Sequence, residues 1–338
     1  MTQATISPEA IQANPEFDPH FLNALAEHGQ QEFDHHQAIR KDWSYHDVLD
    51  RDVTAKLAVM PPLQLDPEVA NIYLGNLVVE KGHAEYDRVT ALVFQGHPVF
   101  RAWKDTWVAE EEQHGDAMLQ WAKVRGLFPK TSDGAVDMGD VHRNIQGYLK
   151  HGLALNFDDA AFGMAYPALQ EIATRITHKE VKDRLPTDEM VGRVLLSKII
   201  ADEERHERFY AAMVRHALHD ADPAMASHQM RGVARSMLGF AMPGIEGDIP
   251  DGEQITAAYQ HTGAFSISKV ARDVLIPMLE DEGPHGWNIA GVEFLDTRAR
   301  RAQERLVKFR EDMRAKVDSD RGLILVLGKA RRELQQAA

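Results

Sequence analysis

The chain of 338 residues contains no cysteine. Disulfide bonds, zinc ribbons, iron–sulfur clusters and catalysis by a thiol are therefore all excluded. A metal site in this chain would have to be built without thiolate, and the sequence offers 17 histidines and 52 acidic residues for that purpose.

Long apolar runs are also missing. No stretch approaches the ~20 uninterrupted apolar residues that a membrane helix needs, and the run Leu323–Leu327 is far too short. Residues 1–15 lack the basic and apolar regions of a secretory signal peptide. We therefore expect no membrane span, and the default location is the cytoplasm.

Positive charge is in short supply, since the formal net charge is −14. An acidic chain is a poor partner for nucleic acid. The segment from Arg298 to Lys316 is an exception, with eight basic residues against three acidic ones. It is either a solvated helix face or a docking surface for an acidic partner, whose attraction salt would weaken. The candidate docking residues are Arg298, Arg301, Arg305 and Lys308.

Strand signals are few, and apolar residues recur mainly at helical spacing, which predicts an all-α protein. Helices are expected over about 18–39, 67–94 and 98–124, from about 139, and over 157–180 and 187–220, then 226–239, 251–260, 266–281 and 296–316. A loop is expected through Trp43 to Pro62. We interpret residues 1–338 as a single domain, with an irregular lead (1–17), a metal-binding four-helix core (65–220) and additional helices (226–316).

Two Glu-x-x-His pairs, Glu111/His114 and Glu203/His206, each follow a further glutamate by 31 or 32 positions. Residues three apart share one face of a helix, so each Glu and His can reach the same site. Each pair also lies within a stripe that otherwise reads as buried, where a carboxylate is costly unless it is paired or bound to metal. The candidate ligands are Glu80, Glu111 and His114 in the first half, and Glu171, Glu203 and His206 in the second.

This set matches what a four-helix bundle needs to hold two metal ions: one Glu from each of two helices and Glu-x-x-His from each of the others. Chance occurrence in a charged helical chain explains one copy more easily than two. Nitrogen and oxygen ligands without thiolate suit iron or manganese, and the residues by themselves leave both open.

Several segments resemble the soluble acyl-[acyl-carrier-protein] desaturases, over about residues 18–316. Residues 107–116 resemble WTAxExxHGD, residues 202–207 resemble DExRHE, and residues 170–174 resemble QExAT. Weaker matches are residues 75–80, followed by Tyr86, to GDxxTE…Y, and residues 40–43 to a short segment ending in Trp.

The resemblance implies a ferritin-like bundle with two Fe ions per chain, bound by the six candidate ligands. It implies an oxygen-dependent desaturase that introduces a double bond into a fatty acyl chain carried on acyl carrier protein. Ferredoxin would supply the electrons, and the protein would be a homodimer. Removing hydrogen from an unactivated methylene pair requires such a cofactor, because no amino-acid side chain can do it.

Further roles follow from the same resemblance. Thr174 would face the oxygen-binding side and deliver protons, unless its hydroxyl only bonds its own helix. Asp202 and Trp43 match positions implicated in electron transfer, and Asp202 could also orient a ligand histidine. His178, one turn beyond Thr174, and Trp43 could equally be packing residues. The cluster Asp34-His35-His36 is expected on the surface.

His83 departs from the family, which has an apolar residue three positions after the first ligand Glu. It could bind metal directly, donate a proton, or be a hydrogen-bonded core histidine. A ligating His83 would favour an alternative to the desaturase, which is our second hypothesis: a di-iron oxygenase of a tethered or small substrate. The third hypothesis is a ferritin-like iron-binding protein without substrate chemistry; the helices after Pro223 and the pair Trp43 and Asp202 argue against it.

Overall fold

The structure is a computed structural model that describes residues 19–82, 87, 90–91, 93–94, 97–129, 132, 137–151, 160–240, 249–280, 286–294 and 296–335. All regular structure in these ranges is helical. None of the helices in the described part of the chain combines the length and the apolar character needed to cross a bilayer.

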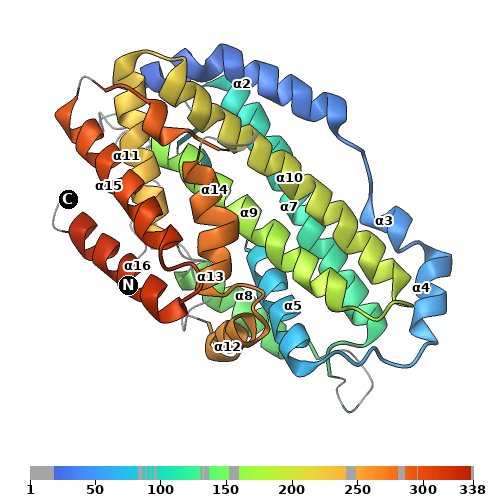
Figure 1. The fold of residues 1–338 in the computed structure, drawn as a ribbon. Helices are drawn as coiled ribbons and strands as arrows, with labels where there is room; N and C mark the ends of the chain where they lie inside the picture. Colours follow the sequence, from blue (N-terminus) through green and yellow to red (C-terminus); the bar gives the residue numbers. More distant parts are fainter. Residues whose placement is uncertain are drawn as a thin grey trace.

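Four helices form the centre of the molecule: α5 (Pro67–Glu80), α7 (Pro98–Arg125), α9 (Ala160–Arg184) and α10 (Met190–His219). Helix α10 packs along α9 and against α7, while α5 packs against both α7 and α9. Figure 1 shows α9 and α10 side by side, with α7 and α5 beyond them. The all-α prediction is confirmed, and the boundaries of the helices expected over 98–124 and 187–220 lie within three residues of those of α7 and α10.

Local sequence explains where these helices begin and end. Asp66 caps α5 by accepting from the backbone N–H of Glu68, and Pro67 follows at the first position of the helix. Helix α7 begins in the same way at His97 and Pro98. It ends at Gly126, whose φ of 66° lies in the left-handed region that glycine adopts without strain.

Outer helices surround this bundle. Helix α2 (Pro19–Ile39) lies along α10 and α7, α11 (Pro223–Gly239) covers α9, and α12 (Gly252–Thr262) packs on α5. The remaining elements are α3 (Tyr45–Val48), α4 (Arg51–Ala58), α8 (Gly139–His151), α13 (Ile267–Val270), the π-helix η1 (Ala271–Leu275), α14 (Ile276–Leu279), the 3-10 helix η2 (Ile289–Gly291), α15 (Thr297–Arg314) and α16 (Asp320–Gln335). The partition into lead, core and additional helices remains a prediction.

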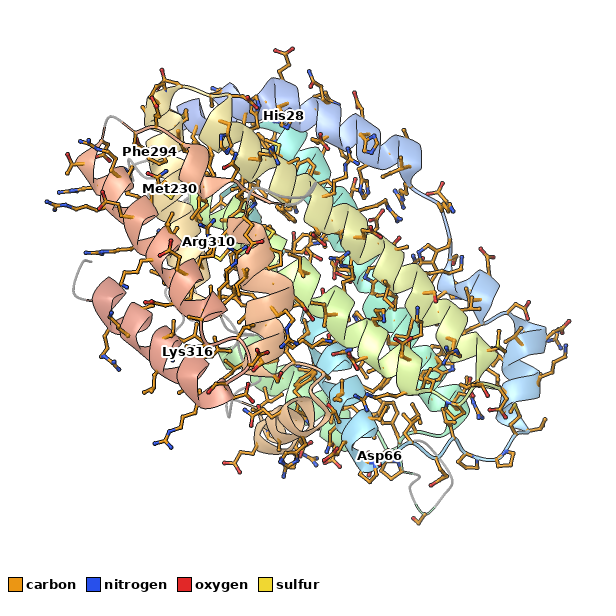
Figure 2. All side chains as sticks on the ribbon, viewed as in Figure 1. His28, Asp66, Met230, Phe294, Arg310 and Lys316 are labelled. Atoms are coloured by element: carbon orange, nitrogen blue, oxygen red, sulfur yellow. The ribbon has the colours of Figure 1, made fainter. Side chains whose placement is uncertain are left out.

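The structure differs from the sequence prediction in three places. The helix expected over 67–94 ends at Glu80 as α5, and residues 81 and 82 form a turn. The segment expected as a loop between Trp43 and Pro62 contains the short helices α3 and α4, which Ser44 and Asp50 cap with their side chains. The C-terminal segment forms α16, which packs against α15, α11 and α13. Figure 2 shows this helical layer around Lys316 and Arg310, on the side of the molecule away from α3 and α4.

Candidate metal centre

The six candidate ligands converge between the four central helices. Helix α5 contributes Glu80 from its last residue, α9 contributes Glu171 from its middle, and α7 and α10 contribute the Glu-x-x-His pairs. All six side chains are buried, with exposed fractions between 0% and 9%. They form two groups that share two carboxylates: Glu80, Glu111, His114 and Glu203, and Glu111, Glu171, Glu203 and His206.

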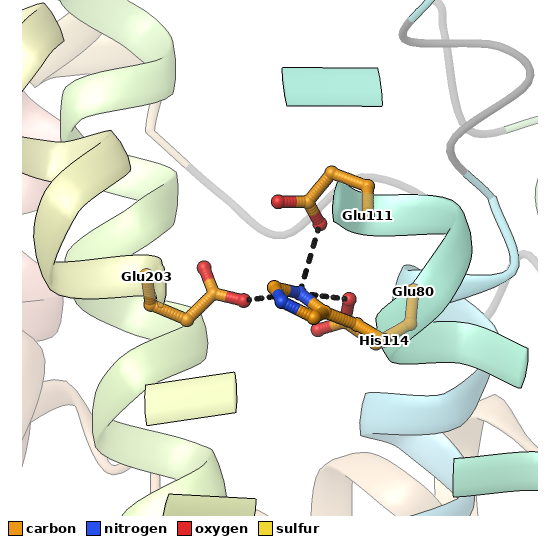
Figure 3. Close-up of side chains that lie close together, drawn as sticks. All are labelled: Glu80, Glu111, His114 and Glu203. Atoms are coloured by element: carbon orange, nitrogen blue, oxygen red, sulfur yellow. Dashed lines mark ion pairs between the residues drawn. The ribbon is translucent and has the colours of Figure 1, made fainter. Parts of the chain in front are cut away.

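Each imidazole directs its Nδ1 atom at carboxylates. His114 Nδ1 lies 3.2 Å from Glu203 Oε1, 3.5 Å from Glu80 Oε2 and 3.8 Å from Glu111 Oε2 (Figure 3). His206 Nδ1 lies 2.9 Å from Glu111 Oε1 and 3.6 Å from Glu171 Oε2. Glu111 and Glu203 therefore stand between the two imidazoles, where a carboxylate can bridge two ions.

This arrangement fits metal ions by its own chemistry. The atoms Glu111 Oε1, Glu203 Oε1, His114 Nδ1 and His206 Nδ1 are buried and face one another as ion pairs, but none of them makes a well-aligned hydrogen bond among the described residues. Buried polar atoms are nearly always satisfied, so four that point into one space call for another partner. A pair of divalent cations would satisfy all four at once.

Electrostatics support the same conclusion. Burial, with repulsion from Glu203 and Glu111, raises the pKa of Glu171 well above its usual range. Burial alone would lower the pKa of His206, but Glu110, Glu111 and Glu171 raise it well above its usual value. Protons therefore compensate the crowded carboxylates, and bound cations would take over that role.

Each imidazole is held from behind by a second carboxylate. His114 Nε2 lies 3.0 Å from Asp202 Oδ2, and Asp202 also accepts a hydrogen bond from Trp43 Nε1 at 2.8 Å and pairs with Arg205. His206 Nε2 lies 2.7 Å from Glu110 Oε2. Such contacts fix the ring orientation and the tautomer that leaves Nδ1 available to a metal.

In this outer layer, the sequence analysis missed Glu110 and misplaced His36. Glu110 Oε1 lies 2.8 Å from Arg40 Nε and 3.4 Å from His36 Nε2. The surface prediction for His36 is wrong, since its exposed fraction is 3%. A sequence signal for Glu110 did exist: it precedes Glu111 just as Asp202 precedes Glu203.

Thr174 lies at the site, where its hydroxyl could either deliver a proton to the centre or bond to its own helix. Its hydroxyl oxygen is 2.8 Å from Glu203 Oε2 and 3.1 Å from the carbonyls of Gln170 and Glu171. The hydroxyl can thus donate to a candidate ligand or to its own helix.

The outer glutamates have different partners. Glu171 accepts a hydrogen bond from Trp107 Nε1 at 3.1 Å. Glu80 Oε1 lies 2.6 Å from His178 Nε2, so the buried His178 contacts a candidate ligand directly. His83 lies outside the described residues, and its role stays a prediction.

Trp43 connects the centre to a basic surface. Its ring is nearly parallel to that of His114, at 14° and 6.3 Å between centroids, and Lys198 Nζ lies 5.6 Å from the centre of the indole. Trp43 and Asp202 line a cavity of about 490 Å³ whose rim includes the exposed apolar residues Met190 and Val194. The basic residues lining it are Lys41, Lys182, Arg193, Lys198 and Arg205.

The four predicted docking residues are exposed on α15. They follow a 3-4-3 spacing and so share one face of the helix. Helix α15 packs against α11, α14 and α16 rather than against the four central helices. The stripe Arg298, Arg301, Arg305 and Lys308 and the cavity beside Trp43 are therefore separate basic surfaces.

Fold and site together define a ferritin-like helical protein with a buried carboxylate–histidine centre suited to two metal ions. Residues 21–322 match the model of a family described as fatty acid desaturase (FA_desaturase_2). The chain therefore belongs to this family.

Relatives by sequence include DesA1 of Mycobacterium tuberculosis, named as an acyl-[acyl-carrier-protein] desaturase, with 24% identity over 273 residues covering 78% of each chain. The chloroplastic acyl-[acyl-carrier-protein] desaturase 6 of rice (Oryza sativa subsp. japonica) is 30% identical over 178 residues, 49% of this chain and 39% of the rice protein. The X-ray structure of Mycobacterium tuberculosis DesA2 matches with a TM-score of 0.55 at 17% identity, covering 75% of this chain and 90% of DesA2, and supports the fold.

Proposed function

We propose that this protein is an oxygen-dependent di-iron desaturase that introduces a double bond into a fatty acyl chain carried on acyl carrier protein. The observation that carries the proposal is the pair of buried groups sharing Glu111 and Glu203, in a chain of the fatty acid desaturase family. Relatives named as acyl-[acyl-carrier-protein] desaturases support the choice of substrate.

The proposed cofactor is two iron ions per chain. His114 and His206 would each bind one ion through Nδ1, and Glu80, Glu111, Glu171 and Glu203 would supply the carboxylate ligands, with Glu111 and Glu203 shared by the two groups. When bound, the ion pair would supply the oxidation of a methylene pair by dioxygen, which protein groups cannot perform.

The residues around the ligands would orient them and handle protons. Asp202 and Glu110 would hold His114 and His206 by accepting from Nε2–H, so that each Nδ1 stays turned inward. Thr174 would hold a transferable proton on Oγ1, within reach of Glu203. Trp103 and Phe209 are buried and stack with 3.7 Å between their ring centroids, and this aromatic pair would exclude water from the centre on the side of His206.

Two acidic partners are proposed for the two basic surfaces. Ferredoxin would dock at the cavity beside Trp43, because Trp43 and Asp202 lead from there to His114. Acyl carrier protein would dock on the α15 stripe. A homodimer in the cytoplasm completes the proposal.

Product mass tests the reaction directly. Iron-loaded protein is supplied with ferredoxin, its reductase, NADPH, oxygen and a panel of acyl carrier proteins bearing different chains. Loss of two hydrogens from one of these chains is the expected result. Gain of an oxygen atom would replace desaturation by oxygenation, and iron loading far above two per chain without product would favour the iron-binding hypothesis.

Glu203→Ala tests the metal assignment. The variant should lose activity and part of its iron, because Glu203 belongs to both ligand groups. Glu204→Ala is the matched control, since Glu204 is the neighbouring residue on the exposed face of α10. Full iron and full activity in Glu203→Ala would contradict the assignment.

A further inference from the structure

A buried hydrogen-bonded chain extends from the candidate ligand Glu80 to α12, outside the four-helix bundle. Tyr259 on α12 donates from its hydroxyl to Asn76 Oδ1 at 2.7 Å. Asn76 Nδ2 lies 3.3 Å from His178 Nδ1, and His178 Nε2 lies 2.6 Å from Glu80 Oε1. None of the four side chains is more than 5% exposed.

The direction of each hydrogen bond follows from the one before it. The Tyr259 hydroxyl donates to the amide oxygen, since the alternative acceptor, the Ile72 carbonyl, is farther away at 3.5 Å. The amide nitrogen of Asn76 then faces His178, and it can only donate. His178 Nδ1 must therefore accept, which leaves the ring proton on Nε2, pointing at Glu80.

The packing of α12 on α5 makes this chain possible. A Cβ atom at Gly75 would lie 2.7 Å from the Tyr259 hydroxyl, so only glycine there permits the approach. Glu80 is the last residue of α5, where the helix no longer fixes the residues after it, and a ligand at that position needs support from outside. Its counterpart Glu171, in the middle of α9, is held by the indole N–H of Trp107, which has no second tautomer.

We propose that Tyr259 and Asn76 are positioning residues for the metal centre: they set the tautomer of His178, whose Nε2–H then holds the Glu80 carboxylate in its ligating orientation. This inference rests on the proposed di-iron function. It makes α12 part of the site although α12 contributes no ligand. The residues 75–80 that resemble GDxxTE carry Asn76 in place of the Asp of that pattern, and an aspartate carboxylate could not donate to Nδ1.

The test compares two tyrosine variants that each lose one buried hydroxyl. Tyr259→Phe removes the first hydrogen bond of the chain. Tyr73→Phe is the control, because Tyr73 lies on α5, is also buried and donates to the Met118 carbonyl at 2.6 Å without contacting His178 or Glu80. Both variants remove a comparable hydrogen bond from the core, so a purely structural role predicts the same behaviour for both.

The first measurement is iron release from the loaded, full-length protein to a chelator. Tyr259→Phe should lower the affinity for iron about tenfold, as expected when a ligand loses the contacts that orient it, and iron should be released correspondingly faster. Tyr73→Phe should release iron at the wild-type rate. Equal release by both variants would overturn the positioning role.

The second measurement reads the tautomer itself. The ¹⁵N shifts of His178 are recorded on the full-length chain loaded with zinc, which has no unpaired electrons, and are assigned by their loss in His178→Gln. Wild type should carry the proton on Nε2, Tyr259→Phe should show both tautomers, and Asn76→Asp should move the proton to Nδ1. A wild-type ring protonated on Nδ1 would overturn the inference. Neither readout depends on product formation, so a failure of the proposed reaction is distinguishable from a failure of the positioning role of Tyr259 and Asn76.

Discussion

At the scale of single residues, the two halves of the centre have matching candidate ligands, but the carboxylates behind the two histidines have different surroundings. Both histidines turn Nδ1 inward and Nε2 toward a carboxylate. Asp202 continues to the surface through Trp43, whereas Glu110 is enclosed by His36 and Arg40. Under the proposed function, this difference would suit the half with His114 for exchange with a partner and the half with His206 for a fixed environment.

Glu110→Gln should weaken one of the two iron sites and spare the other. The amide keeps the size of the side chain, but it brings an NH2 group toward His206 and Arg40 and offers one acceptor instead of two. The expected loss is about tenfold in affinity at the site of His206. Iron titration of the full-length protein measures it, as a second equivalent that binds more weakly than the first.

Glu112→Gln serves as the control, because Glu112 is two positions away and exposed. Identical binding curves for Glu110→Gln and wild type would contradict the role assigned to Glu110.

The inner residues could be predicted because their spacing is dictated by the helix. Glu and His three apart must share a face, and two such pairs with preceding glutamates leave little freedom. His36 could not be placed in this way, since helix periodicity does not say which neighbour covers a given face. Its neighbour His35 is only half-buried, whereas His36 is buried against Glu110, a distinction made by the packing of α2 alone.

At the scale of helices, α7 and α10 meet through a glycine. A Cβ atom at Gly192 of α10 would lie 2.3 Å from the ring of Trp121, which is fully buried on α7 and donates to Glu189. Gly192→Ala should therefore destabilise the fold by about 1–3 kcal/mol, the usual cost of overpacking a core. Chemical denaturation of the full-length protein measures this as a lower midpoint.

Gly328→Ala on α16 is the matched comparison. Its nearest neighbour to an added Cβ is Arg332 Nη1 at 3.5 Å, which is ordinary contact. Because Gly costs about 0.5–1 kcal/mol relative to Ala inside a helix, this variant should be stabilising. A Gly192→Ala variant as stable as Gly328→Ala would disprove the close contact of α7 and α10.

Long helices were predictable and short or surface helices were not. Helices α3 and α4 span only four and eight residues, and capping by Ser44 and Asp50 defines them more than any apolar period does. In α16, the consecutive run Leu323–Leu327 hides the helical spacing. Leu323 is buried there, whereas Ile324 and Leu325 are 54% and 67% exposed.

The contact between α2 and α10 predicts a pH effect on stability. His28 stacks on His216 with 4.2 Å between ring centroids, and burial together with the charge of His216 lowers the pKa of His28, against the opposing effect of Glu32 and Asp220. The folded state therefore binds the proton of His28 less tightly than the unfolded state does. Stability should fall as the pH decreases through 6.5 toward the lowered pKa of the folded protein.

His28→Gln should reduce that acid-side loss, since glutamine does not titrate. Denaturation midpoints of both proteins at pH 7.5 and at decreasing pH below 6.5 measure the difference. His35→Gln, which changes a half-buried histidine on the same helix outside the contact of His28 with His216, should behave like wild type. Parallel curves for His28→Gln and wild type would refute the effect.

At the scale of the whole molecule, charge is arranged against the net balance. The chain carries −14 overall, yet both the cavity beside Trp43 and the α15 stripe gather basic residues. The stripe could be predicted from the sequence because its residues lie on consecutive turns of one helix. The cavity was not, because Lys41 and Lys198 come from segments that only the packing of the chain brings to one place.

Charge reversal on the two surfaces should affect the two partners separately. Lys41→Glu with Lys198→Glu should raise the KM for ferredoxin, and Arg305→Glu with Lys308→Glu should raise the KM for the acyl carrier protein substrate. Because electrostatic steering is lost, each KM should rise about tenfold at low salt. The rise should become smaller as added salt shortens the screening length. Each double variant is the control for the other, measured with one partner varied and the second saturating. If each pair raised both KM values equally, only the general charge of the protein would matter; an effect on neither partner at any salt concentration would remove both surfaces as docking sites.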